Sequence, residues 1–173
     1  QLLDEETALR IEAAVIDLLC LGTLTNQVRG WRSVELGRIP LEELQTYYDA
    51  PPCDIREATL LIRINQRYRH GMPAQELYEA TRGIWRLGER CHQARFAMAV
   101  FEGVVREVYR INRWHPAGTT PYETRTRKDV ASPNRVEFIG AVASGAMRSR
   151  YVGKSVAARF PRGLQSPVIY VNC

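Results

Sequence analysis

The sequence predicts an α+β fold: a helical N-terminal half, followed by a small curled sheet or barrel of about five short strands. Two observations lead to this prediction. Apolar residues recur at three- and four-residue steps up to Gly88 and at alternate positions after it. Several short strands with one helix are typical of a small, partly closed sheet. The 173 residues, 45% of them hydrophobic, are enough for a buried core and exclude global disorder.

Helical spacing and boundary residues predict five helices in the first half of the chain. The first begins at Asp4, a residue that can cap a helix, and the acidic residues after it suit the positive end of the helix. Glycine or proline separates each expected helix from the next, as is typical of helix boundaries. The expected ranges are 4–21, 25–36, 40–50, 54–69 and 73–85.

Alternating and apolar segments predict the strands of the second half. Residues 94–101 and 104–111 flank the turn signal Glu102-Gly103 and form an expected hairpin. The connection over residues 115–134 is rich in Pro, Thr and Arg, and loops of this length are usually functional or mobile. The other expected elements are strands at 135–143 and 167–171, a brief pairing at Tyr151-Val152, a turn at 144–150 and a short helix at 154–160.

The net charge of +5 is unevenly distributed over the two predicted domains, residues 1–72 and 73–173. The helical residues 1–72 hold 8 basic and 11 acidic residues, a net charge of −3. Residues 73–137 hold 11 basic and 8 acidic residues, and residues 138–173 hold five basic residues and no acidic one. A one-sided basic block favours an anionic partner, first of all nucleic acid.

Several function classes are disfavoured by what the sequence lacks. No apolar run approaches the ~20 residues of a membrane span, and the acidic start does not resemble a signal peptide. The four cysteines are scattered without a CxxC pair, so we expect a reduced cytoplasmic protein without a zinc site. No nucleophile–base pair stands out, and we expect no catalytic residue, metal or cofactor.

Aromatic residues and arginines are interleaved in the second half. Aromatic rings can stack on an exposed or flipped base, while arginine side chains hold phosphates. Trp85 and Trp114 stand at the ends of expected elements, where a pocket wall and a core position are equally open interpretations. Tyr109, on the expected strand between them, is a third candidate wall.

The order of segments from residue 73 onward carries a family resemblance. A helix leads into Gly83-Ile84-Trp85, a strand ends at Ala99-Val100, and a turn, the strand 103–111 and the segment 138–142 follow. In this order residues 73–173 resemble the PUA-like superfamily, which includes the ASCH, EVE and YTH domains. The resemblance implies a small β-barrel that binds nucleic acid, often a modified or flipped base, in bacterial restriction or RNA-modification systems. It also implies that Trp85 occupies the position of a tryptophan that helps form the base cage in the YTH branch.

A second resemblance involves Tyr151 to Ser155, followed by Arg159. This segment is similar to the second signature of the GIY-YIG nucleases, a tyrosine-containing strand that leads into a helix with an arginine. The family also needs an upstream Gly-Ile-Tyr strand and a downstream metal-binding glutamate. Residues 138–140 read Phe-Ile-Gly, and no acidic residue follows Glu137 to hold a cation. A degenerate metal-dependent endonuclease is therefore kept as an alternative.

The prediction is a module that binds DNA or RNA and reads a modified or flipped base. Its base pocket would be formed by Trp85, Tyr109 and Trp114. Its phosphate contacts would come from the basic tail: Arg148, Arg150, Lys154, Arg159 and Arg162. A protein-interaction module is another alternative, in which the acidic residues 1–72 bind a partner or self-associate. No membrane partner is expected.

Overall fold

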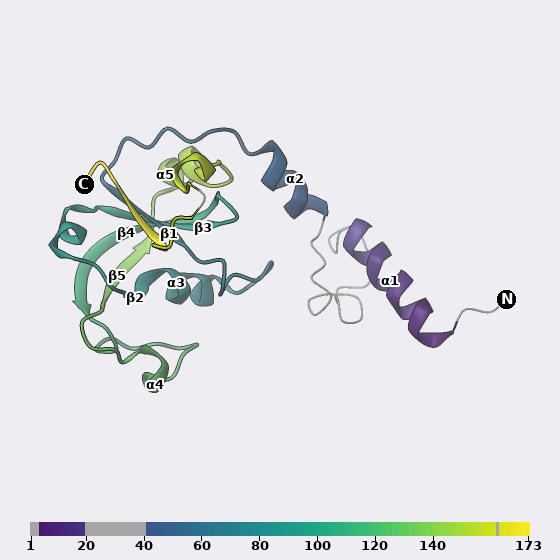
Figure 1. Ribbon diagram of the computed structural model, residues 1–173, viewed down its shortest axis with the longest axis horizontal. Coiled ribbons are helices and arrows are strands. Elements are labelled where there is room, and N and C mark those ends of the chain that lie inside the picture. The colour runs from purple at the N-terminus through teal and green to yellow at the C-terminus, as the bar shows by residue number, and fades with distance from the viewer. Residues whose placement is uncertain (1–3, 20–40, 162) are drawn as a thin grey trace. The chain divides into compact units, whose positions relative to one another are not determined.

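The computed structural model describes residues 4–19, 41–161 and 163–173 (Figure 1). The chain divides into two compact units, residues 1–49 and 50–173. The domain boundary predicted after residue 72 therefore shifts to Asp49-Ala50, because a strand within the intervening segment belongs to the sheet of the second unit.

The described part of the first unit is helical. The helices α1 (Glu5–Leu19) and α2 (Leu41–Asp49) confirm two of the predicted helices. The Asp4 carboxylate caps α1, since it accepts hydrogen bonds from the Thr7 backbone N–H at 2.9 Å and from the Thr7 hydroxyl at 2.6 Å. The helix predicted over residues 25–36 lies outside the described residues.

The second unit is built on one sheet that curls into a half-barrel (Figure 1). Its six strands are β1 (Thr59–Arg63), β2 (Gly83–Trp85), β3 (Phe96–Phe101), β4 (Val104–Pro116), β5 (Val136–Val142) and β6 (Val168–Val171). The order across the sheet is β2-β5-β4-β3-β1-β6, which places β2 and β6 at its two edges. The α+β class is thus confirmed, with six strands in place of about five.

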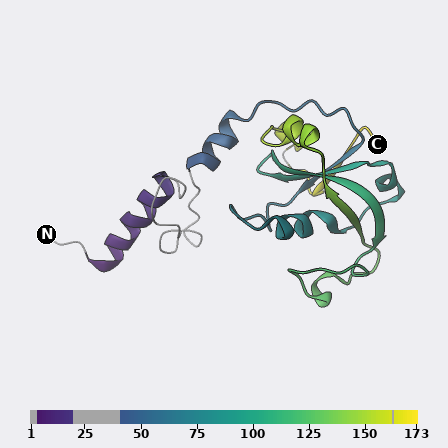
Figure 2. The same ribbon diagram turned by 180° about the vertical axis from the view of Figure 1, so that it is seen from behind.

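Helices cover both faces of this sheet (Figures 1 and 2). On one face, α3 (Ala74–Arg82) packs on an apolar cluster that includes Leu60 and Ile62 of β1. On the other face, α5 (Gly145–Tyr151) packs on a cluster that includes Leu61. The remaining short elements are the 3-10 helices η2 (Glu89–Gln93) and η3 (Ala157–Arg159) and the helix α4 (Arg127–Val130).

The helix predicted over residues 54–69 is wrong, because this segment contains β1. β1 pairs in parallel with β3 and antiparallel with β6, which covers both of its edges, and an apolar cluster lies on each of its faces. Leu60, Leu61 and Ile62 are all fully buried. A continuous apolar run of this kind does not distinguish a central strand from a helix by its period.

Three further local predictions need correction. The helix expected to run to Trp85 ends at Arg82, and the next three residues form the edge strand β2. The turn expected at 144–150 is the helix α5, whose Met147 and Tyr151 share one face on the core. Tyr151 therefore ends a helix and does not pair in the sheet. The hairpin is confirmed, and β4 extends beyond the expected 111 to Pro116.

Gly140 of β5 lies opposite Ile111, where β4 makes a bulge. A Cβ at this position would lie 2.2 Å from the backbone oxygen of Arg110. We expect Gly140→Ala to lower the free energy of unfolding by about 1–3 kcal/mol, because the two backbones must move apart. Urea denaturation measures this change. Gly145→Ala is the control, since nothing lies within 4 Å of its Cβ, and an equal loss in both variants would contradict the prediction.

Candidate nucleic-acid interface

The curled sheet leaves a hollow between parts of the chain that belong to its opposite edges. We call this the Trp85 hollow; it has a volume of about 500 Å³. Its lining comes from the end of β1, from the edge strand β2, from Arg135 just before β5, and from the segment that leads into β6. The hollow therefore brings together residues that are more than a hundred positions apart in the sequence, such as Arg63 and Gln165.

Trp85 is half-buried and forms one wall of this hollow. Its indole N–H donates to the Thr81 carbonyl oxygen at 2.7 Å, which holds the ring against the end of α3. The ring also packs on the apolar cluster between α3 and the sheet. Both interpretations of Trp85 therefore apply, because the residue packs on the core and also lines the hollow.

The charge of the Trp85 hollow is positive. Arg63, Arg67 and Arg135 line it, and none of its lining residues in the described chain is acidic. Arg63 donates to the Leu164 carbonyl oxygen at 3.0 Å, and Arg135 donates to the Ile84 carbonyl oxygen at 3.1 Å. These two guanidinium groups are held by neutral oxygens, so their charge is not cancelled locally. Arg67 is exposed at the rim.

Amide side chains add hydrogen-bonding groups to the same hollow. Gln66 and Gln165 are exposed lining residues. Asn65 is held in place, because its Nδ2 donates to Glu102 Oε1 at 2.6 Å and its Oδ1 accepts from the Glu102 backbone N–H at 3.3 Å. Sequence reasoning missed these amides, and no local pattern points to them, since their role depends on the closure of the sheet.

Behind β2, the long loop is tied down by the buried carboxylate of Glu137. This carboxylate accepts hydrogen bonds from the backbone N–H of Gly118 at 3.0 Å and of Thr120 at 2.9 Å. The hydroxyls of Thr120 and Tyr122 also donate to it, at 2.7 and 2.8 Å. Burial alone would raise the pKa of Glu137, but these hydrogen bonds outweigh it, so the pKa lies below its ordinary value.

A second buried carboxylate, Glu79 of α3, holds the next part of the loop. It accepts hydrogen bonds from the backbone N–H of Glu123 at 2.6 Å and of Thr124 at 3.0 Å, and from the Thr124 hydroxyl. Burial again raises the pKa of Glu79, and the hydrogen bonds lower it by more. The loop that was expected to be functional or mobile is therefore anchored to α3 and β5.

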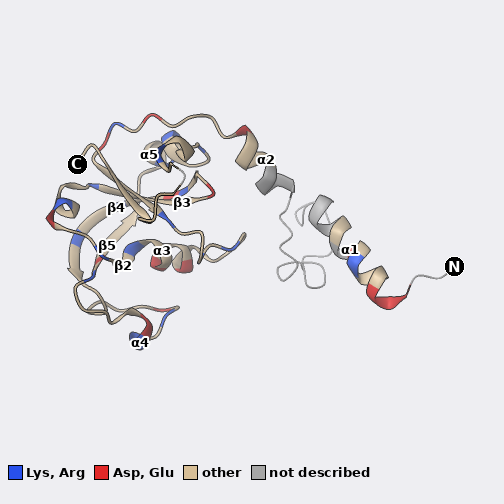
Figure 3. Cartoon of the chain, viewed as in Figure 1, with Lys and Arg blue, Asp and Glu red and all other residues tan. Residues whose placement is uncertain are grey.

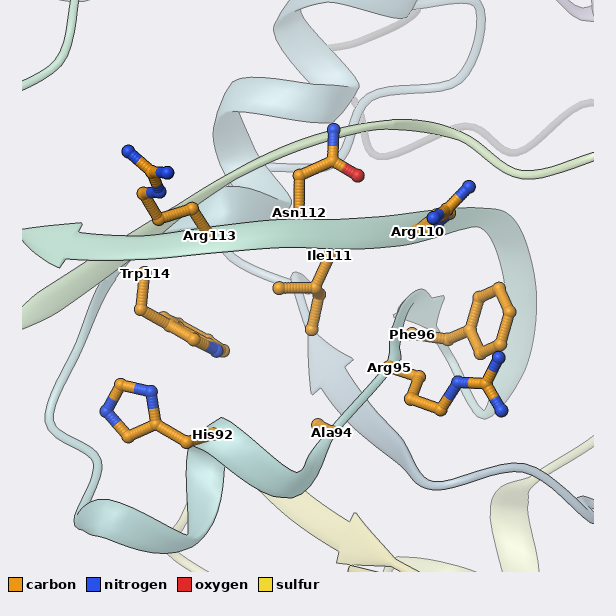
Figure 4. A pocket seen from close by; sticks show the side chains of 9 residues that line it. All are labelled: His92, Ala94, Arg95, Phe96, Arg110, Ile111, Asn112, Arg113 and Trp114. Carbon is orange, nitrogen blue, oxygen red and sulfur yellow. The ribbon is translucent and has the colours of Figure 1, made fainter.

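Trp114 lines a different hollow, between the far half of β4 and the link from η2 to β3 (Figure 4). Tyr109 lies in the core with 1% of its surface exposed, and its ring centroid is 5.2 Å from that of Tyr78. The three residues of the predicted base pocket thus share the apolar cluster on the α3 face of the sheet, but they do not line one common hollow. Trp85 and Trp114 stand on strands that are separated by β5, and each belongs to its own hollow.

The predicted phosphate contacts are not a free basic surface. Arg148 makes two hydrogen bonds with the Glu107 carboxylate, at 2.8 and 2.9 Å, and Arg150 contacts Glu57 at 2.8 Å. Arg159 is exposed, Lys154 is half-buried, and Arg162 lies outside the described residues. Basic residues are spread over the sheet and its connections and are not collected on α5 (Figure 3). The tail's charge is thus partly neutralised by carboxylates from the first 107 residues.

Tyr151, the tyrosine of the nuclease-like segment, is fully buried. Its hydroxyl donates to Glu57, which is a carboxylate that the sequence comparison with nucleases did not anticipate. Burial and this hydrogen bond raise the pKa of Tyr151. The phenol is therefore closed off from solvent and held in its protonated form. Among the described residues no cluster of three or more His, Cys, Asp or Glu side chains could hold a metal ion.

No protein-family model, curated protein or solved structure matches this chain. Within the described ranges, none of the helices is long and apolar enough to cross a membrane.

Proposed function

We propose that residues 50–173 form a nucleic-acid-binding module and that the Trp85 hollow receives one unpaired or flipped base. One observation carries this proposal: a hollow of about 500 Å³ that combines an indole wall, three arginines and several amides, without an acidic residue in its described lining. An acidic or neutral ligand fits such a surface, and a cationic one does not.

Each group in the hollow has a matching partner in a nucleotide. Stacking of a base on an aromatic ring contributes about 1–3 kcal/mol. The amides of Gln66 and Gln165 offer both donors and acceptors, which is the chemistry that reads the edge of a base. Arg67, exposed at the rim, is placed to contact a phosphate that flanks the bound base.

The proposal retains two expectations of the PUA-like resemblance, namely a barrel-like architecture and the binding of nucleic acid. A curled half-barrel with a Gly-x-Trp segment at its edge is compatible with a domain that binds a base in the mouth of the barrel. DNA and RNA both satisfy the chemistry above. A modified base would be distinguished by the polar groups at the edge of the hollow, in a restriction or RNA-modification setting.

The test is binding of the full chain to short duplexes that are either fully paired or contain one unpaired base. We expect tighter binding to the second duplex, and we expect Trp85→Ala to weaken this preference at least about fivefold, because a lost stacking contact costs about 1–3 kcal/mol. Fluorescence anisotropy with DNA and RNA versions measures both affinities.

Two controls separate a lost contact from a damaged fold. Trp85→Phe keeps a stacking surface but loses the hydrogen bond to Thr81, so it should retain most of the preference. Tyr109→Phe removes a hydroxyl in the core and should leave binding unchanged. Equal binding of both duplexes by the unmodified protein would contradict the proposal. Cleavage of either duplex in Mg²⁺ that is lost in Tyr151→Phe would favour the nuclease alternative.

A further inference from the structure

We propose that the hollow beside Trp114 is a second nucleic-acid contact, in which Arg95, Arg110 and Arg113 bind backbone phosphates. This inference rests on the proposed function and assigns its phosphate contacts to β4 and the start of β3 in place of the basic tail. The hollow has a volume of about 480 Å³.

The hollow exists because β4 is longer than its neighbour β3. Their pairing ends at Phe96 and Arg110, followed by one hydrogen bond from the Ile111 N–H to the Arg95 carbonyl oxygen at 2.9 Å. β4 continues to Pro116 along β5, while the chain before β3 turns away into η2. The edge of β4 that faces η2 is therefore open beyond Ile111.

A bulge in β4 arranges the polar side chains on one side. The pairing of β4 with β5 shifts register between Ile111 and Arg113. As a result Arg110, Asn112 and Arg113 project from one side of the strand and Ile111 and Trp114 from the other, and all five line the hollow (Figure 4). A regular strand would have placed Arg110 and Arg113 on opposite faces.

The three arginines are exposed and carry uncompensated charge. In the part of the chain that the structure describes, none of their side chains lies within ion-pair distance of a carboxylate or makes a hydrogen bond. His92 is the lining residue with an acidic neighbour, and its Nε2 lies 3.7 Å from the exposed Glu89 carboxylate. Arg148 and Arg150, by contrast, would have to leave their carboxylates to bind a phosphate. Three uncompensated charges beside one hollow favour a polyanion.

Trp114 favours a nucleic acid over other polyanions. The Trp114 indole N–H is buried and has no hydrogen-bond acceptor among the described residues. Figure 4 shows the Trp114 ring and the Phe96 ring at opposite ends of the set of lining side chains. The ring itself is half-buried and lines the hollow, so its accessible part offers a base a stacking surface, which contributes about 1–3 kcal/mol.

The salt dependence of binding tests this assignment directly. Each phosphate contact contributes about 0.7–0.9 to the slope of log affinity against log salt concentration. We expect the triple variant Arg95→Ala/Arg110→Ala/Arg113→Ala to lose about 2–3 from this slope relative to the unmodified full chain. The fold should be retained, because none of the three side chains makes a hydrogen bond in the described structure.

A matched triple variant controls for net charge. Arg56, Arg69 and Arg148 are exposed but paired with Asp54, Glu76 and Glu107. Changing these three to alanine removes the same formal charge, and we expect the slope to fall by less than about 1. An equal loss of slope in both triple variants would overturn the inference, because it would show a general charge effect.

The remaining outcomes separate this inference from the proposed function. If the unmodified protein binds an unpaired base through Trp85 but the first triple variant keeps the full slope, the inference alone fails. If the unmodified protein binds no DNA or RNA, both fail. Binding of polyglutamate as tight as that of an oligonucleotide, lost in the first triple variant, would mean that the hollow accepts acidic proteins and would also overturn the inference.

Discussion

Replacing Glu137 with alanine is expected to lower the free energy of unfolding by at least about 3 kcal/mol, because several buried donors lose their acceptor at once. The carboxylate is fully buried and accepts four hydrogen bonds, from Gly118, Thr120 and Tyr122. An unsatisfied buried donor costs about 1–3 kcal/mol, and hydrogen bonds to a charged group are the stronger ones. Chemical denaturation measures the loss.

The loop should lose protection in the same variant. Hydrogen exchange at the backbone amides of Gly118 and Thr120 is expected to accelerate in Glu137→Ala. The amides of β3 are expected to keep the same order of exchange rates among themselves. Glu123→Ala is the matched control, since Glu123 lies in the same loop with an exposed side chain. A loss in Glu123→Ala as large as that in Glu137→Ala would show that the loop, and not the buried carboxylate, sets the stability.

Acidification is expected to destabilise the protein as the pH falls below about 4.5, the ordinary pKa of a glutamate side chain. The pKa values of Glu57, Glu79 and Glu137 are all below that value in the folded state. Burial raises the pKa of each of these carboxyl groups, and hydrogen bonds lower it by more. For Glu57 the largest lowering effect is the hydrogen bond from the Tyr151 hydroxyl. The unfolded chain therefore binds protons more readily than the folded one.

The sign of this dependence follows from linkage. A lowered pKa stabilises the fold above the unfolded-state pKa, and the contribution is lost as the pH falls through the folded-state pKa. Urea denaturation between about pH 7 and about pH 3 should show this fall, and it should be shallower in Glu79→Gln and in Glu137→Gln. A steeper fall in these variants, or a maximum of stability at the acid end, would contradict the assignment.

The two buried carboxylates also support the Trp85 hollow from behind. Gly83 is the first residue of β2, the edge strand that lines the hollow. A Cβ at this position would lie 2.9 Å from the Cβ of Glu137. Arg82 donates to the Thr120 hydroxyl at 2.9 Å, and its guanidinium lies 3.8 Å from the centroid of the Tyr122 ring. β2 is thus fixed between α3, β5 and the loop. Variants that release the loop are expected to affect base binding as well as stability.

Local sequence patterns were sufficient to predict those elements that depend only on residues close to them in the sequence. The hairpin of β3 and β4 follows from alternating side chains and a short turn, and Glu102 and Gly103 adopt the positive φ values of 47° and 75° that such a turn needs. The helix α1 follows from its cap and its apolar spacing. These features depend on contacts between residues within a few positions of one another.

The candidate site was only partly accessible to the same reasoning. Trp85 and Trp114 were recognised as residues at element ends, and each of them lines a hollow. The run from Arg110 to Trp114 contains two arginines next to a tryptophan, a signal that could have pointed to the second hollow. The bulge that aligns these arginines depends on pairing with β5, whose partner residues Ile139 and Gly140 lie 26 and 29 positions further along the chain, and no local pattern predicts it.

The distribution of available positive charge is the property for which the sequence prediction and the tertiary structure differ most. The sequence by itself determined the α+β class, the hairpin and the excess of basic residues in the second half. Only the tertiary structure decided which of these charges are neutralised, because Arg148 and Arg150 meet carboxylates 41 and 93 residues away. It also decided that residues 59–63 form a strand, since an apolar run becomes β when strands on both sides satisfy its backbone. Long-range pairing thus decided which arginines keep their charge available for a partner.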